Sequence, residues 1–352
     1  MVNLHRQQQD KTQPVKGGIP LVIKGAVTVA NKIFGCIRET SENRALAGAC
    51  IKAWDKDIGD DDFLGETISD TEGYYAISYP DSLWDTIPGA GSLTRPDIYV
   101  TVSIRNAAGE WVIIAKSPVY KDHKLSEDLS INLDCTVEKP VAKHTHFEPA
   151  LHGFHFANNF NLTVDIMNLK LGSWNMGFCG GMCACALNRY KKNISIPADT
   201  EPPVQGLPLY KELLTRQITS MVTILAKIYD WQSAPDITKW YRKHSVGFRT
   251  KKQWSLLKEE LDKGRPVILI LIRSAGYFAN PTDNHQVIAT GYEYHSTTGD
   301  LKIYTYDPNW PDTGTHLSFC FGLADDQIRA QDSTGADLRG FFVNPNTDLA
   351  SE

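Results

Sequence analysis

The chain has 352 residues, of which 42% are hydrophobic and 22% charged, with a formal net charge of -5. This balance excludes a chain that is disordered throughout and offers no basic patch for nucleic acid or an anionic membrane. The length predicts a soluble protein of two domains.

Residues 1–24 form a polar N-terminal extension rather than a targeting signal. The apolar stretch Ile19–Ile23 stops at Lys24 and is too short for a signal-peptide core or a membrane span. The seven cysteines are an odd number without the spacing of a secreted disulfide framework. We therefore expect reduced thiols and a cytoplasmic protein, or one exported without a cleavable signal peptide.

Residues 25–136 consist of short apolar runs separated by turn residues. Such runs at near-regular spacing predict an all-β sandwich or barrel. The predicted strands cover 27–29, 33–37, 49–54, 74–77, 98–102 and 112–114.

Three segments of this region, 35–37, 47–55 and 70–75, resemble the transthyretin-like sandwich family. The last segment, Asp-Thr-Glu-Gly before two tyrosines, is also a hairpin-turn signal in its own right. The resemblance implies an immunoglobulin-like module without chemistry of its own, which binds a partner or delivery machinery.

An acidic loop lies between the predicted strands. Its carboxylates, which could be calcium ligands, are Asp55, Asp57, Asp60, Asp61, Asp62 and Glu66. The ordered spacing of a calcium loop is missing, which favours a solvated acidic loop over a metal site.

Residues 137–150 are predicted to be a linker, because prolines flank a charged stretch that has no periodicity. Four histidines, His144, His146, His152 and His155, lie in or just after it. No cysteine or carboxylate completes a recognised zinc spacing with them, so we favour no metal here.

Residues 151–352 are predicted to form an α+β domain, with helices first and an antiparallel sheet later. Helices are expected over 179–190, 208–229 and 253–261. Strands are expected over 267–272, 286–294 and 301–306.

Cys179 is the candidate nucleophile, because it is placed where a loop becomes a helix. Gly180 and Gly181 follow it. Unpaired N–H groups and the helix dipole at that end stabilise a thiolate and an oxyanion. His285 opens a later apolar run and Asp307 closes another. A histidine can take the thiol proton and return it to a leaving amine, and a carboxylate can fix the imidazole tautomer.

Segments 264–267, 284–292 and 304–309 together resemble the papain-like cysteine peptidases, in particular the bacteriocin-processing, double-glycine-leader branch. The resemblance implies a papain-like fold and a catalytic triad of Cys179, His285 and Asp307. Members of that branch usually belong to transporters, a role that we do not transfer to this chain.

The oxyanion hole departs from the family pattern, since Ser173 stands where a glutamine is usual. Asn175 is the nearest amide and our candidate, together with the backbone N–H of Cys179. The substrate cleft is expected to involve Trp174, Phe178, Asn284 and Trp310.

Cys183 and Cys185 follow the nucleophile within the same predicted helix, where small core residues are the simpler interpretation. A structural metal site of these cysteines with a histidine is the rival, but the spacing directs the last thiol to another face. We therefore predict neither a metal nor a cofactor.

The sequence leaves three functions open. The first is a cysteine hydrolase that cleaves a peptide or amide bond through a thioester, and the second is a glutamine deamidase or acyl transferase with the same triad. The third is a catalytically idle two-module binding protein. A bacterial effector or toxin, in which the sandwich delivers the hydrolase to a protein substrate, is a further setting for the enzyme.

Overall fold

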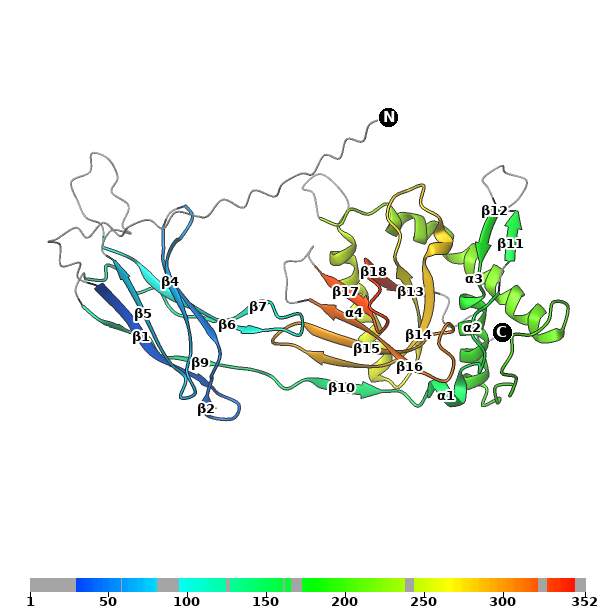
Figure 1. Cartoon of the computed structure of the whole chain (residues 1–352), viewed down its shortest axis with the longest axis horizontal. Coiled ribbons are helices and arrows are strands. Elements are labelled where there is room, and N and C mark those ends of the chain that lie inside the picture. Colours follow the sequence, from blue (N-terminus) through cyan, green and yellow to red (C-terminus); the bar gives the residue numbers. More distant parts are fainter. Residues whose placement is uncertain are drawn as a thin grey trace, which may run out of the picture.

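The computed structural model describes residues 30–57, 59–80, 95–124, 127–160, 162–165, 173–237, 244–321 and 328–345, with the main chain alone given for 162–165 and 173–176. The N-terminal extension 1–24 lies outside these residues. An all-β region comes first, followed by helices and an antiparallel sheet (Figure 1). The predicted layout of two dissimilar units is thereby confirmed.

The first unit consists of two sheets that enclose a core of alternating side chains. In one sheet β1 lies between β2 and β5 and also pairs in parallel with β8 and β9, and the other has the order β4-β3-β6-β7. Ile51 and Ala53 of β3 meet Val100 and Val102 of β6 in the core, while the intervening residues face outward. The strands are β1 (Ala30–Glu39), β2 (Arg44–Ala45), β3 (Cys50–Asp55), β4 (Asp62–Ile68), β5 (Tyr74–Pro80), β6 (Ile98–Arg105), β7 (Trp111–Lys116), β8 (Leu129–Ser130) and β9 (Leu133–Cys135).

The second unit is built on a seven-stranded sheet in the order β17-β16-β15-β14-β13-β18, with β10 added beside β14. Its strands are β10 (Val141–His144), β13 (Val267–Ile272), β14 (His285–His295), β15 (Asp300–Tyr306), β16 (Gly314–Cys320), β17 (Arg329–Asp332) and β18 (Gly340–Val343). Two more strands, β11 (Leu162–Asp165) and β12 (Ser173–Met176), form a separate hairpin.

Helices cover both faces of this sheet. They are α1 (Pro149–His152), α2 (Cys179–Lys191), α3 (Pro208–Gln232) and α4 (Val246–Asp262), and a 3-10 turn η2 spans Pro281–Asp283. Every residue of β13 is buried: Ile268 and Ile270 pack in the cluster that contains α2 and α3, and Leu269 and Leu271 in the cluster that contains α4. A run of six apolar residues is thus explained by a strand buried on both faces.

The predicted elements of this unit agree with the observed ones except at α4. That helix begins at Val246, seven residues before the predicted start, because Ser245 caps it by accepting a hydrogen bond from the Phe248 N–H at 3.1 Å. Gly247 interrupts the apolar periodicity, so this first turn was not predicted from the sequence.

The segment predicted as a linker, 137–150, contains β10 and the start of α1. Strand β10 pairs with β14 from Val141 opposite Tyr294 to His144 opposite Gly291. A side chain at Gly291 would lie 2.6 Å from the Lys143 carbonyl oxygen, so glycine permits this close approach. The chain therefore enters the second unit as a strand of its sheet.

The sandwich contacts the second unit at the β14–β15 turn and the end of β16 (Figure 1). The Ala107 N–H donates to Asp300 at 3.0 Å, and the Asn106 amide lies 2.9 Å from the Cys320 sulfur. The Glu138 N–H donates to Thr297 at 2.8 Å. His285 begins β14 and His295 ends it, so about 33 Å of strand separates these contacts from His285.

Helices α2 and α3 approach each other closely at Gly181, which faces the backbone of α3. A Cβ at Gly181 would lie 2.2 Å from the Leu213 carbonyl oxygen. Replacement Gly181→Ala is therefore expected to lower the free energy of unfolding of the second unit by about 2 kcal/mol or more, because backbone must move. Denaturant unfolding followed by helix circular dichroism measures this.

The matched control is Gly314→Ala at the exposed start of β16, where a Cβ meets nothing within 4 Å. It should change the free energy of unfolding by less than about 0.5 kcal/mol. Equal stability of the two variants would contradict the proposed packing.

Candidate active site

Cys179 is the first residue of α2, and its half-buried thiol lies beside the side chain of His285, which lowers the pKa of that thiol. The preceding residue, Phe178, provides no side-chain cap. The Cys179 N–H therefore opens the helix without an intrahelical partner. The structure brings together the thiol and the imidazole, which are 106 residues apart in the chain.

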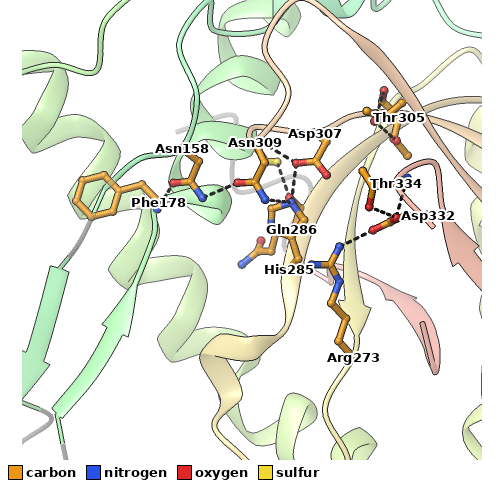
Figure 2. Close-up of polar contacts among 12 residues, drawn as sticks. Asn158, Phe178, Arg273, His285, Gln286, Thr305, Asp307, Asn309, Asp332 and Thr334 are labelled. Atoms are coloured by element: carbon orange, nitrogen blue, oxygen red, sulfur yellow. Dashed lines mark hydrogen bonds and ion pairs between the residues drawn. The ribbon is translucent and has the colours of Figure 1, made fainter. Parts of the chain in front are cut away.

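His285 lies between the thiol and Asp307. Its Nε2 is 2.7 Å from Asp307 Oδ1 (Figure 2), and both side chains are buried. Because Nε2 is engaged by the carboxylate, Nδ1 is the ring nitrogen left for the thiol. His285 and Asp307, which are 22 residues apart in the sequence, are thus brought together by the antiparallel pairing of β14 with β15.

The site favours a thiolate and an imidazolium. Burial by itself would raise the pKa of Cys179, but the hydrogen bond and charge of His285, together with the Gln286 N–H, hold that pKa below its usual range. Burial would lower the pKa of His285, yet the Asp307 carboxylate outweighs it and raises the pKa to about 10. The interactions of Cys179 therefore favour its thiolate more than those of an ordinary cysteine do.

Cys183 and Cys185 lie in the hydrophobic core. Burial raises the pKa of both thiols, that of Cys183 well above its usual range. The Cys183 thiol donates weakly to the Gln286 carbonyl at 3.5 Å. Both cysteines are therefore core residues, and among the described residues no group of three metal-ligating side chains is arranged to hold an ion.

Two of the histidines near the predicted linker and part of the acidic loop have protein partners. His155 lies 2.6 Å from Asp312, and His144 packs against Tyr304 with tilted rings whose centres are 4.8 Å apart. In the acidic loop, Asp61 accepts hydrogen bonds from Lys56 and from Tyr99, both at 2.6 Å, which lower its pKa to about 2.

The predicted cleft residues have different positions. Phe178 is completely buried and stacks on Phe160 with ring centres 4.2 Å apart, so its side chain belongs to the core and not to a cleft. Asn284 is buried and accepts from the Arg273 N–H at 3.0 Å. Trp310 is exposed and follows the turn after Asp307. The side chains of Trp174 and Asn175 lie outside the described residues.

A small hollow adjoins Cys179. Its volume is about 30 Å³, and it is lined by Gly177, Cys179, Gln217, Met221, Ile228, Pro281, Thr282, Asn284 and Gln286. Gln217 is 1% exposed, and its Oε1 accepts from the Gly181 N–H at 2.8 Å. Since a backbone N–H can only donate, the Nε2 of Gln217 is the atom left to face the hollow.

Sequence reasoning missed Gln217 and Asn158. Gln217 stands in the apolar stripe of α3 four residues after Leu213 and four before Met221, so a buried amide in that stripe was a usable signal. Asn158 had no such signal. Its side chain accepts from the Phe178 N–H at 2.6 Å and donates to Asn309 at 3.2 Å (Figure 2).

Comparison with known families gives a match for part of the chain. Residues 206–318 match the Peptidase_C39 like family. The match supports a cysteine peptidase family. The matched segment contains His285 and Asp307 but begins after Cys179. The fold places Cys179 beside these two residues.

No curated protein matches the chain. Among solved structures, a 9R-lipoxygenase from Cyanothece PCC8801 has 13% identity and a TM-score of 0.23, with coverage of 97% of this chain and 44% of that one. A chlorocatechol 1,2-dioxygenase from Pseudomonas putida has 14% identity and a TM-score of 0.20, with coverage of 32% and 62%. The chain spans less than two thirds of either protein, and similarity at these scores supports no functional argument.

Alkylation of Cys179 tests the ionised pair. With its pKa lowered, the thiolate persists below pH 8.5 and is lost only as the pH falls through the lowered value. Iodoacetamide should therefore label Cys179 rapidly at pH 7, while Cys183 and Cys185 stay unlabelled in the folded protein. The rate against pH, with the labelled site mapped by mass spectrometry, measures this.

His285→Ala should slow labelling of Cys179 at pH 7 by about tenfold or more, because each unit of pKa is a factor of ten in the thiolate. Cys183→Ala is the control and should leave the profile of Cys179 unchanged. A wild-type profile with the ionisation of a free cysteine would contradict the ion pair.

Proposed function

We propose that the second unit is a papain-like cysteine peptidase or amidase with Cys179 as nucleophile, His285 as acid and base, and Asp307 as the orienting carboxylate. The observation that carries this is the series from the Cys179 thiol at the N-terminus of α2, through the adjacent imidazole of His285, to the buried Asp307 that is hydrogen-bonded to it. The match to the Peptidase_C39 like family supports the same reaction class.

The proposed reaction begins when the Cys179 thiolate attacks the carbonyl carbon of the scissile amide. A carbon–sulfur bond forms and the carbonyl oxygen becomes an oxyanion, which the Cys179 N–H is placed to stabilise. The carbon–nitrogen bond then breaks, and the leaving nitrogen takes the proton from Nδ1 of His285. Asn175 remains our sequence-based candidate for a second oxyanion donor.

Hydrolysis of the thioester completes the cycle. Water attacks the acyl carbon, neutral His285 accepts its proton, and Cys179 leaves as a thiolate. Asp307 accepts from Nε2 throughout, and it stabilises the imidazolium before the leaving nitrogen is protonated and again after water has given up its proton. The same triad serves a deamidase or acyl transferase when the amide is a glutamine side chain or the acceptor is an amine.

We propose that the sandwich is a transthyretin-like binding module rather than an inhibitory lid. Its contacts with the second unit are at Asp300 and Cys320, and the segment after it contacts Thr297, all at the far end of β14 and β16 from His285. The position supports a role in binding a substrate or partner. In the described part of the chain no helix is both long and apolar enough to cross a membrane.

Incubation of the full chain with denatured proteins and a glutamine-rich protein tests the reaction type. We expect new peptide termini in the mass spectra, and none with Cys179→Ala. Conversion of glutamine to glutamate without cleavage would instead support the deamidase. Absence of both, together with a slow and unselective thiol, would favour the idle binding protein.

The hollow beside Cys179 predicts that the substrate has a small side chain next to the scissile bond, since a volume of about 30 Å³ holds one or two water-sized groups. Met221→Ala should enlarge it and raise kcat/KM for substrates with a larger residue there by about tenfold. Competing peptide substrates that differ at this residue measure the preference.

Val222→Ala is the matched control, because Val222 is the neighbouring residue of α3 but 73% exposed. This variant should show the wild-type preference between the competing peptide substrates. An unaltered preference in Met221→Ala would show that the hollow does not receive the substrate.

A further inference from the structure

Asn158 joins the two sides of the candidate active site, although it comes from neither α2 nor the sheet. Its Oδ1 accepts from the N–H of Phe178, the residue before the nucleophile, at 2.6 Å. Its Nδ2 donates to the Asn309 Oδ1 at 3.2 Å, and its backbone N–H donates to the Pro308 carbonyl at 2.9 Å. Three hydrogen bonds therefore connect it to both loops.

The orientation of the Asn158 amide is determined by chemistry. The N–H of Phe178 can only donate, so the oxygen of the Asn158 amide must face it and the NH₂ group must face Asn309. Asn309 in turn donates its backbone N–H to Asp307 Oδ1 at 2.8 Å. The asparagine pair thus continues to the carboxylate that orients His285.

These contacts form a closed ring. Starting at the Cys179 thiol, it passes through His285, Asp307, Asn309 and Asn158 to the backbone of Phe178 and returns to Cys179. Figure 2 shows the part from His285 to Phe178, in which the residues are joined by hydrogen bonds. The ring is completed by the peptide bond between Phe178 and Cys179 and by the contact between the Cys179 thiol and the His285 imidazole.

The hairpin β11–β12 explains why Asn158 can take this position. Leu162 pairs with Met176, so the hairpin closes on itself and returns the chain near its point of departure. Asn158 lies four residues before the hairpin and Cys179 three residues after it. The close approach is also visible at Gly177, where a Cβ would lie 2.6 Å from Asn158 Nδ2.

We propose that Asn158 is a positioning residue, which through Asn309 sets the distance between the Cys179 thiol and the His285–Asp307 pair. The proposal rests on the proposed thiol chemistry of the second unit. Loss of the Asn158 side chain frees the loop before Cys179 to move relative to the sheet, which lengthens the thiol–imidazole contact and weakens the ion pair.

The test compares the pH profile of Cys179 alkylation in the full chain for wild type, Asn158→Ala and Asn309→Ala. A hydrogen bond between uncharged groups has a modest effect, so labelling at pH 7 should slow by about 3- to 10-fold in each variant, with the thiolate ionisation displaced to higher pH. The double variant should slow no more than the worse single one, because both break the same ring.

The matched control is Asn159→Ala. Asn159 is the exposed neighbour, and its backbone N–H bonds to the Ala157 carbonyl while no hydrogen bond of its side chain is found in the described chain. Its profile should equal that of wild type. Asn158→Asp provides a second variant should Asn158→Ala fail to fold: the carboxylate still accepts from the Phe178 N–H but can no longer donate to Asn309, so it too should slow labelling.

An unchanged alkylation profile in both Asn158 variants would overturn the proposal, even if peptide cleavage were lost. The proposal would also be overturned if labelling of Cys179 were slower in Asn158→Ala but as fast as wild type in Asn309→Ala. Asn158 would then not act on the thiol through Asn309. These outcomes differ from failure of the proposed function, in which wild-type Cys179 itself would show no His285-dependent ionisation.

Discussion

The pairing of His285 with Asp307 is the constraint on which the site depends. Burying a charged imidazolium and a carboxylate is costly, and the cost is offset only when the geometry is good and the remaining polar atoms are satisfied. Here the Nε2–Oδ1 distance is 2.7 Å, and the carboxylate also accepts from the Asn309 N–H at 2.8 Å. The Asp307 carboxylate raises the pKa of His285, and His285 in turn lowers the pKa of Cys179.

The sheet provides the rigidity that this pair requires. Strand β14 begins at His285, pairs with β13 from its first residue, and lies beside β15, whose C-terminal end leads into Asp307. Side chains on both faces of β13 are buried under helices. His285 and Asp307 are therefore fixed by main-chain pairing, and it is the loop before Cys179 that needs an additional link.

Gly181 and the side-chain amides of Gln217 and Asn158 provide that link. Gly181 lets α2 approach the backbone of α3, and Gln217 of α3 accepts from its N–H. Asn158 holds the preceding loop on the other side. The first turn of α2 is thus held by polar contacts on both sides, with a small hollow between α3 and η2 as the space left beside the thiol. The described part of the sandwich contacts the opposite end of β14.

The sequence by itself determined the order of the elements and the residues able to do chemistry. The six apolar residues of β13, the stripe of α3 and the cysteine before Gly180 and Gly181 are local patterns, and local patterns reflect the period of a helix or strand. It was wrong about the start of α4, and it placed Phe178 in a cleft although that side chain is buried. Only the tertiary structure decided that Asn158 meets Asn309, 151 residues away, and that the hollow beside Cys179 is small. Contacts of that separation depend on how whole strands and helices pack, for which a single sequence carries no periodic signal.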